Sequence, residues 1–324
     1  MSPRPSVTVL IPARNEVADL RGCLAAVLDQ DHPAADLQIV VVDGGSTDGT
    51  GELARAVLGA VPGLTHEIVV NEQGTTPSNL NAGLAVAVGS ILCRVDARTR
   101  IEPHYVSTCR ALLEERDDVA VVGGAQVAVA RDRSARSQGI ARALNNRWAM
   151  GGSPYRAAAE SQAADTVYLG AFRVADLIAV GGWNEEMLSN QDFELNRRMA
   201  TRGFVWFDAR LQSSYLPRQT HREVWTQYRR FGEGKVRYWR ATGDRPQPRQ
   251  AAILAAPLAA AAIAVLAPRR AVATAAVVGI VGLEEGGAPP GPSALGARFH
   301  AMIALLMVTV GWTTGIWKGL VSAP

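Results

Sequence analysis

The sequence predicts an α/β fold in which helices flank a mostly parallel sheet, followed by an apolar helical region near the C-terminus. In the first hundred residues, short apolar runs alternate with segments whose apolar residues recur at helical spacing. The runs are apolar on both faces, which is typical of parallel strands covered by helices on either side. Beyond about residue 250 the chain is nearly free of charge, and this change in composition indicates a second region.

The expected elements follow one another along the first part of the chain. Strands are expected at 7–13, 37–45, 66–72 and 90–96, and helices at 16–30, 50–60 and 76–89. The last helix opens on Thr76, Pro77 and Ser78, residues that favour a helix start. Because ligands of parallel sheets bind beyond the carboxyl ends of the strands, we expect the functional site at residues 12–16, 43–48 and 96–98.

The alternating pattern weakens after a further strand that is expected at 119–129. Residues 131–165 are rich in Arg, Ala, Gly and Ser without a clean period. We expect a helix there, followed by a mobile loop. No internal repeat is visible.

Polar segments end three of the expected strands: PARNE at 12–16, VVDGGSTDGT at 41–50 and RVDAR at 94–98. A carboxylate at the end of a buried strand is costly unless it accepts hydrogen bonds, and Asp43 is well placed to accept one from a nucleobase N–H. We expect Thr47 and Asp48 merely to cap the next helix. The motif G-x-G-x-x-G is absent after the strands expected at 7–13 and 37–45, which argues against a dinucleotide site.

An ordered set of motifs resembles the family 2 glycosyltransferases with the nucleotide-diphospho-sugar transferase fold. The motifs are VTVLIPARNE, IVVVDGGSTDGT, NLNAGLAVAVGSILCRVDA, GGWNEEMLSNQDFELNRRM and QYRRF, and they cover about residues 5–240. Asp-Ala-Arg in place of Asp-x-Asp, with an apolar tail, resembles the bacterial glucosyltransferases of succinoglycan-type exopolysaccharide assembly. The resemblance implies a GT-A-like, Rossmann-like sheet and inverting transfer from a nucleotide sugar.

The resemblance also implies roles for individual residues. Those lining the base and ribose of the donor would be Pro12, Ala13, Arg14, Asn15 and Glu16, with Asp43 on the base. Asn81 and Gly83 would approach the ribose and diphosphate, and Asp96 would face the ribose or a metal. Asp192 occupies the position of the general base.

Inversion in a single displacement needs one carboxylate that takes the proton from the acceptor hydroxyl. Asp192 follows a loop and opens a helix that we expect to be anchored by Phe193, Leu195 and Met199. The alternative is that Asp192 is an N-cap residue, and the two roles are compatible. Glu194 points elsewhere on the helix and is expected to be a solvated or structural acid.

The resemblance leads us to expect a second acid where Arg98 stands. A hard cation on a diphosphate usually needs one or two protein carboxylates, and Arg98 has only donors. In one hypothesis, Mg or Mn still binds through Asp96, phosphate oxygens and water, while Arg98 grips a phosphate. In the other, Arg98 and the basic cluster at 229–237 replace much of the metal's charge. We favour the first.

The segment QYRRF departs by one residue from the Q-x-x-R-W of the family, which lies near the acceptor and the diphosphate. The residues concerned are Gln227, Arg229, Arg230 and Phe231. An alternative interpretation is an amphipathic helix that lies on the membrane, since Val224, Trp225, Tyr228 and Phe231 share one face. Both interpretations can hold. His221 is expected to be a surface residue rather than a metal ligand.

Three apolar runs near the C-terminus predict a membrane region. Runs at 251–267 and 271–283 are shorter than a full span, so two short crossings or a hairpin that dips into the membrane both stay open. The run at 299–320 is long enough and carries Trp312 and Trp317. The alternative is a helical subdomain packed on a soluble partner. Residues 218–249 hold nine Arg or Lys against three acids, which suits an anionic membrane surface or a phosphorylated substrate.

The expected domains are therefore 1–220 for catalysis, 221–250 as a basic juxtamembrane segment and 251–324 as apolar helices. Val7–Ile11 is too short for a secretory signal, and three cysteines without paired spacing suit a reduced compartment. We therefore expect the inner cell membrane, with the catalytic domain in the cytoplasm.

The expected function is transfer of a hexose from a nucleotide-diphosphate sugar, with a UDP-sugar favoured, to a lipid-linked or polysaccharide acceptor. Two alternatives stay open: a processive polysaccharide synthase subunit, and a non-catalytic membrane scaffold that binds nucleotide sugar. No nucleic acid partner is expected, and the oligomeric state is left open.

Overall fold

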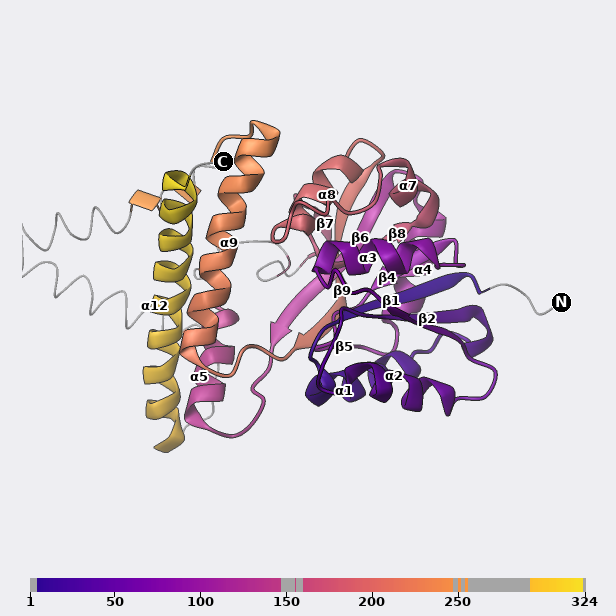
Figure 1. The fold of residues 1–324 in the computed structure, drawn as a ribbon, viewed down its shortest axis with the longest axis horizontal. Coiled ribbons are helices and arrows are strands. Elements are labelled where there is room, and N and C mark those ends of the chain that lie inside the picture. Colours follow the sequence, from indigo (N-terminus) through magenta and orange to yellow (C-terminus); the bar gives the residue numbers. More distant parts are fainter. Residues whose placement is uncertain are drawn as a thin grey trace, which may run out of the picture. The chain divides into compact units, whose positions relative to one another are not determined.

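The computed structural model describes residues 5–146, 155, 160–246, 250–251, 254–255 and 292–322. The chain divides into two units (Figure 1). The first comprises Met1–Val127 and Ala157–Tyr215, and the second comprises Ala128–Arg156 and Leu216–Pro324. The break after Tyr215 lies near the boundary expected at residue 220, but the second unit also takes a segment from the middle of the catalytic region.

A nine-stranded mixed sheet forms the centre of the first unit, counting the strands of the described residues. Its strand order is β3-β2-β1-β4-β8-β6-β9-β5, with β7 paired to β9. The strands are β1 Val7–Ala13, β2 Leu37–Asp43, β3 Thr65–Val70, β4 Ile91–Arg94, β5 Thr99–Ile101, β6 Val119–Ala128, β7 Gln162–Ala163, β8 Tyr168–Arg173 and β9 Phe204–Tyr215.

The predicted α/β class is confirmed, and the parallel pairing occupies one half of the sheet. Strands β3, β2, β1 and β4 are parallel neighbours. From β4 onward, β8 pairs antiparallel with both β4 and β6, and β9 pairs antiparallel with β5 and β7. The four expected strands of the first hundred residues are thus β1 to β4, and the strand expected at 119–129 is β6 of the antiparallel half.

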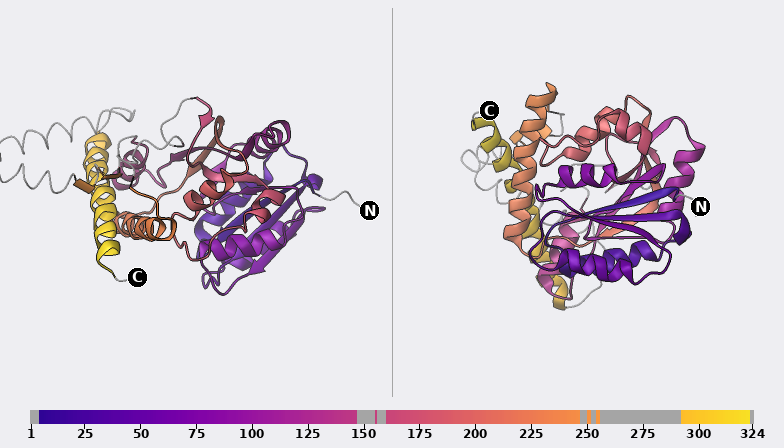
Figure 2. Two further views of the ribbon diagram at one scale, coloured as in Figure 1. Left: turned by 90° about the horizontal axis from the view of Figure 1, so that it is seen from above. Right: turned by 45° about the vertical axis from the view of Figure 1, so that its right-hand side comes forward.

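Helices cover both faces of the parallel half (Figures 1 and 2). The helices of this unit are α1 Val17–Leu28, α2 Thr50–Gly59, α3 Thr76–Ala85, α4 Tyr105–Glu115, α7 Val174–Ala179 and α8 Gln191–Met199, with a 3-10 turn, η1 Ala34–Asp36. Val9 and Ile11 of β1 join Leu24 of α1 in the main core cluster. Leu10 points to the opposite face, toward Gly83 of α3. Both faces of β1 are therefore buried, which explains its unbroken apolar sequence.

The second unit contains three described helices: α5 Ala135–Leu144, α9 His221–Thr242 and α12 Pro292–Val321. Figures 1 and 2 show α9 and α12 side by side. A Cβ at Gly315 of α12 would lie only 2.0 Å from the carbonyl oxygen of Arg229 in α9, and one at Gly311 would lie 2.8 Å from that of Trp225. Glycine at these positions lets the two backbones approach closely.

The helix predicted at 299–320 is confirmed as part of α12, and α5 supplies the helix expected within 131–165. The apolar runs at 251–267 and 271–283 lie outside the described residues, apart from 251 and 254–255, as does most of the loop expected before residue 165. In the described part of the chain, Leu295–Val321 is the helix that is long and apolar enough to cross a membrane, and 39% of its most apolar window is buried.

Candidate active site

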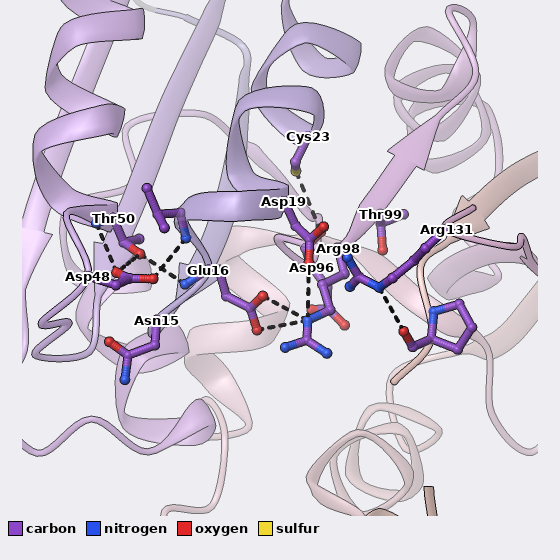
Figure 3. A network of polar contacts seen from close by, with 12 residues as sticks. Asn15, Glu16, Asp19, Cys23, Asp48, Thr50, Asp96, Arg98, Thr99 and Arg131 are labelled. Atoms are coloured by element: carbon purple, nitrogen blue, oxygen red, sulfur yellow. Dashed lines mark hydrogen bonds and ion pairs between the residues drawn. The ribbon is translucent and has the colours of Figure 1, made fainter. Parts of the chain in front are cut away.

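The loops that follow β1 and β2 are locked together at the carboxyl ends of these strands (Figure 3). Asn15, with a φ of 55°, donates its backbone N–H to Oγ of Ser46 at 2.9 Å, and its Oδ1 accepts the backbone N–H of Thr47 at 2.9 Å. Asp48 accepts from the backbone N–H of Val17 at 3.1 Å and of Thr50 at 3.1 Å. Asp48 therefore does more than the expected capping, because it joins the starts of α1 and α2.

The carboxylate of Asp43 ends β2 and is buried, with 7% of the residue exposed. Its Oδ1 accepts the backbone N–H of Ser46 at 2.9 Å. Pro12 and Ala13 pair with Val42 and Asp43 in the sheet. The first residues of the expected donor site therefore gather at the carboxyl ends of β1 and β2. Arg14 also lies there and reaches the carbonyl oxygen of Gly74 at 3.1 Å.

Asn81 and Gly83 of α3 have structural partners. Asn81 donates Nδ2 to the carbonyl oxygen of Trp183 at 2.8 Å and to Oε1 of Glu185 at 2.9 Å. Its Oδ1 accepts the Trp183 backbone N–H at 2.9 Å. Gly83 faces the sheet, where a Cβ would lie 2.0 Å from Cδ1 of Leu10. Asn81 thus ties α3 to the loop before α8, and Gly83 lets α3 pack on β1.

A buried arginine brings together two carboxylates that lie far apart in the sequence. Arg94, at the end of β4, is 4% exposed. Its Nε donates to Oδ1 of Asp96 at 2.8 Å, and its Nη1 donates to Oδ1 of Asp192. The side chains of Asp96 and Asp192 are 33% and 40% exposed. Sequence reasoning missed Arg94, although a charged side chain in a short buried strand signals paired acids.

Asp192 is the second residue of α8, after Asn190 in a left-handed conformation with φ of 62°. The N-cap residue of α8 is Asn190 and Asp192 lies within the first turn, so the N-cap alternative is wrong. Removal from water raises the pKa of the Asp192 carboxyl, the Arg94 guanidinium opposes this rise, and the Asp96 carboxylate adds to it. Of the expected anchors, Leu195 and Met199 are buried and Phe193 is half-buried.

Arg98 forms an ion pair with acids of the loop and helix that follow β1 (Figure 3). Its Nε lies 2.7 Å from Oε2 and 3.0 Å from Oε1 of Glu16, and 3.7 Å from Oδ2 of Asp19. The three side chains are 21%, 16% and 8% exposed. Arg98, which stands where a second acid is expected, therefore compensates the negative charges of Glu16 and Asp19.

The donor set for a metal is small. No group of three or more His, Cys, Asp or Glu side chains that could hold a metal ion occurs among the described residues. Asp96 offers the carboxylate oxygen that Arg94 does not engage, and its side chain is partly exposed. One carboxylate together with phosphate oxygens and water is a donor set that Mg²⁺ accepts, so the residues present fit a cation that arrives with a phosphorylated ligand.

Comparison with known proteins identifies the family. Residues 8–168 match the profile described as glycosyl transferase family 2. The chain belongs to this family. It is 28% identical to the succinoglycan biosynthesis protein ExoA of Rhizobium meliloti (strain 1021), over 97% of this chain and 95% of that protein.

A second relative is the dolichyl N-acetyl-alpha-D-glucosaminyl phosphate 3-beta-D-2,3-diacetamido-2,3-dideoxy-beta-D-glucuronosyltransferase of Methanococcus voltae, with 24% identity over 71% of this chain and 72% of that protein. Among solved structures, mannosyltransferase PcManGT from Pyrobaculum calidifontis, in complex with GDP-Man and Mn2+, matches with a TM-score of 0.59 and 22% identity. The match covers 98% of this chain and 88% of that one and shows a shared GT-A fold. The chain is therefore a glycosyltransferase.

The QYRRF residues of this glycosyltransferase lie on α9 in the second unit. Arg229 donates Nη1 to Oε1 of Glu233 at 2.6 Å and lies over the ring of Trp225 at 5.4 Å. Phe231 is 36% exposed and meets Tyr228 edge-on at 5.5 Å. Val224 and Tyr228 are buried, so half of the face that was expected to lie on a membrane is covered by protein.

His221, at the start of α9, stacks on His300 of α12 with ring centroids 5.1 Å apart. Its Nε2 lies 3.2 Å from the carbonyl oxygen of His300. Burial lowers the pKa of His221, which keeps the ring neutral. The residue is partly exposed and also packs against α12 of the same unit.

Proposed function

We propose that this glycosyltransferase moves a hexose from a nucleotide-diphosphate sugar, with a UDP-sugar favoured, to a lipid-linked or polysaccharide acceptor, with inversion and at a membrane. The observation that carries the proposal is the pairing of Asp96 and Asp192 through Arg94, which puts a base candidate beside the end of β4. The likeness to a succinoglycan biosynthesis protein over nearly the full chain supports a polysaccharide product.

Asp192 is the proposed general base. Its side chain is 40% exposed at the start of α8, so an acceptor hydroxyl can reach the carboxylate. A pKa raised by removal from water makes the carboxylate a stronger base than a fully hydrated one. The carboxylate takes the hydroxyl proton as the oxygen attacks the anomeric carbon and the nucleotide diphosphate leaves from the opposite face of the sugar.

The proposed donor site lies at the carboxyl ends of β1 and β2 and is formed by the loops that follow these strands. Asp43 keeps one oxygen for a nucleobase N–H, since the other is held by Ser46. The contacts of Asn15 with Ser46 and Thr47 fix the shape of these loops before a donor arrives. Lining residues proposed for the base and ribose are Pro12, Ala13, Arg14, Asn15 and Glu16.

A divalent cation, Mg or Mn, is proposed at Asp96, and the solved mannosyltransferase neighbour contains Mn2+. When bound, such an ion neutralises charge on the leaving diphosphate. Arg98 is proposed to contact a phosphate, because its Nε is held by Glu16 while its Nη groups make no hydrogen bond to the described residues. Glu16 thereby orients the guanidinium.

Membrane association is proposed for the second unit. The exposed face of α12 carries large apolar side chains at helical spacing: Leu295, Phe299, Met302, Leu306, Val310 and Trp317. This composition suits contact with lipid. The proposed location is the inner cell membrane with a cytoplasmic catalytic domain. Residues proposed near the acceptor and diphosphate, on the strength of the family resemblance, are Gln227, Arg229, Arg230 and Phe231.

The test is a donor screen on detergent-solubilised full-length protein. Labelled nucleotide sugars are offered with Mn²⁺ and lipid-linked acceptors, and donor binding is followed by thermal shift. We expect one donor to be turned over, with turnover lost in Asp192→Asn and kept in Asp118→Asn, which removes an exposed acid paired with Arg116. A donor that binds without turnover would instead favour the scaffold alternative, and long products would favour the processive one.

A further inference from the structure

Arg94 has an unusual position for a charged residue. It ends the short strand β4 and pairs with Leu10 of β1 in the sheet. The preceding residue, Cys93, pairs with Ala171 of β8, so neighbouring strands hold β4 on both sides. A guanidinium that is 5% exposed in such a strand is stable only with well-placed partners. The sheet fixes the backbone of Arg94, so its side chain can hold bound groups in fixed positions.

The partners of Arg94 are the two carboxylates of the proposed site. Nε binds Asp96, two residues on, and Nη1 binds Asp192, on a helix that comes much later in the chain. A guanidinium is planar and holds its donors in a fixed fork. The two carboxylates that it binds therefore keep one mutual position. The loop before α8, with Asn190 left-handed, lies outside the sheet, whose strand β4 ends two residues before Asp96.

We propose that Arg94 is a positioning residue, which sets the base carboxylate of Asp192 against Asp96 and so aligns the attacking hydroxyl with the leaving diphosphate. The inference rests on the proposed role of Asp192 as base. Its physical reason is that a single displacement needs the acceptor and the leaving group in line, and a misplacement of about 1 Å costs roughly 10²-fold in rate. Arg94 contacts neither substrate in this role.

The decisive variant is Arg94→Lys. Lysine keeps the positive charge and the apolar stem but offers a single ammonium in place of a planar fork. A purely charge-balancing role would survive this change, whereas a positioning role would not. The matched control is Arg110→Lys. Arg110 bridges two acids of the same unit away from the site, with Nη1 2.6 Å from Oδ2 of Asp36 and Nε 2.8 Å from Oε1 of Glu114.

For Arg94→Lys, we expect kcat to fall by about 10²-fold or more while donor KM and nucleotide binding stay within a few-fold of wild type. Arg110→Lys should leave kcat and KM unchanged. The double variant Arg94→Lys with Asp192→Asn should be no slower than Asp192→Asn alone, since Arg94 acts through that carboxylate. If the lysine variant proves unstable, Arg94→Gln takes its place in the double variant, and Arg94→Gln with Asp192→Asn should again be no slower than Asp192→Asn alone.

Three results would overturn the inference: wild-type kcat in Arg94→Lys, a loss confined to donor KM, or a double variant whose losses multiply. These differ from failure of the proposed function. If Asp192→Asn turns over donor at the wild-type rate, the base assignment is wrong and the role of Arg94 is overturned with it. If Asp192→Asn is inactive and Arg94→Lys is fully active, only the role of Arg94 is overturned.

Discussion

The substitution Arg98→Asp tests how this site divides charge between a guanidinium and a cation. Arg98 lies 2.7 Å from Glu16 and 3.7 Å from Asp19, and all three side chains are less than a quarter exposed. Aspartate at this position restores the second acid that is expected from the family resemblance. It also turns one cation beside two acids into a cluster of three acids.

The expected cost follows from these contacts. Two like charges about 4 Å apart repel by ~4 kcal/mol at an effective dielectric constant near 20. Breaking a largely buried ion pair costs roughly 3–5 kcal/mol. The two effects overlap, because the shorter aspartate side chain can turn toward water, so we expect a total loss of about 3–5 kcal/mol in the free energy of unfolding. A cation at 100 times its Kd would recover about 2.7 kcal/mol.

The assay is urea unfolding of wild type, Arg98→Asp and the neutral control Arg98→Gln, in EDTA and in increasing Mn²⁺. We expect Arg98→Asp to be less stable than Arg98→Gln in EDTA and to recover with Mn²⁺, whereas Arg98→Gln stays unaffected by the ion. Equal stability of the two variants in EDTA would refute the reasoning about clustered acids.

Sugar transfer, measured on the same proteins, distinguishes the two hypotheses about how the charge of the diphosphate is neutralised. If a cation works with Asp96, Arg98→Asp should keep or tighten the metal dependence of transfer. If Arg98 and the basic cluster carry the charge, wild-type transfer should survive exhaustive EDTA treatment unchanged, and Arg98→Asp should abolish it.

Further predictions concern the packing around the site. Gly83→Ala should lower the free energy of unfolding by about 1–3 kcal/mol, because Leu10 must move, while nucleotide affinity by calorimetry stays unchanged. Gly315→Leu should separate α12 from α9 and lower the melting temperature, whereas Leu306→Ala on the exposed face of α12 should not. Asn81→Ala should cost about 1–3 kcal/mol in urea unfolding and speed proteolytic cleavage near Trp183, since that backbone N–H loses its acceptor.

The parallel half of the sheet was predictable from the sequence, whereas in the antiparallel half only β6 was predicted, as the strand expected at 119–129. Val7–Ala13 and Leu37–Asp43 are unbroken apolar runs, and only strands buried on both faces need such runs. In contrast, β9 mixes exposed, half-buried and buried residues over 12 positions without regular alternation, and its partners β5 and β7 are two or three residues long. Such short partners leave no periodic signal.

The candidate site was predictable residue by residue but not as a set of contacts. The motifs single out Asp96 and Asp192, yet the link between them is Arg94, which is 98 residues from Asp192 in the chain. Periodicity carries no information about which distant carboxylate an arginine meets. For the same reason, a glycine such as Gly83 can be assigned to ligand approach or to helix packing only when its neighbours are known.

Helix α9 illustrates a related limit. Its apolar face predicts a helix that lies on a surface, and the sequence offers no means of telling lipid from protein as the covering material. The glycines of α12 supply the answer for part of that face, because a Cβ at Gly311 would lie 3.3 Å from Cδ1 of Trp225. Phe231, on the same face of α9, is exposed, so the interpretation as a membrane-lying helix still applies to that residue.

Asp48 gives a pH dependence whose sign follows from its contacts. Partial burial alone would raise the pKa of its carboxyl, but hydrogen bonds from the Thr50 hydroxyl and the backbone of Val17 and Thr50 lower it below the usual 3.8. The unfolded chain therefore binds this proton at higher pH than the folded one. The stability that Asp48 contributes is present above the unfolded pKa and is lost as the pH falls through the folded pKa.

Asp48→Asn should then be less stable than wild type at pH 7, and the difference should shrink as the pH is lowered from about 5. Urea unfolding at several pH values measures it, with Glu52→Gln on the exposed side of α2 as the control for removing one acid from this helix. A difference that stays constant down to the lowest pH at which the protein folds would mean that Asp48 acts through shape rather than charge. The junction of α1 and α2 beside the proposed donor site would then be ordered by the shape of Asp48, the Asn15 contacts and the hydrogen bond from the Glu16 backbone N–H to the Thr50 hydroxyl.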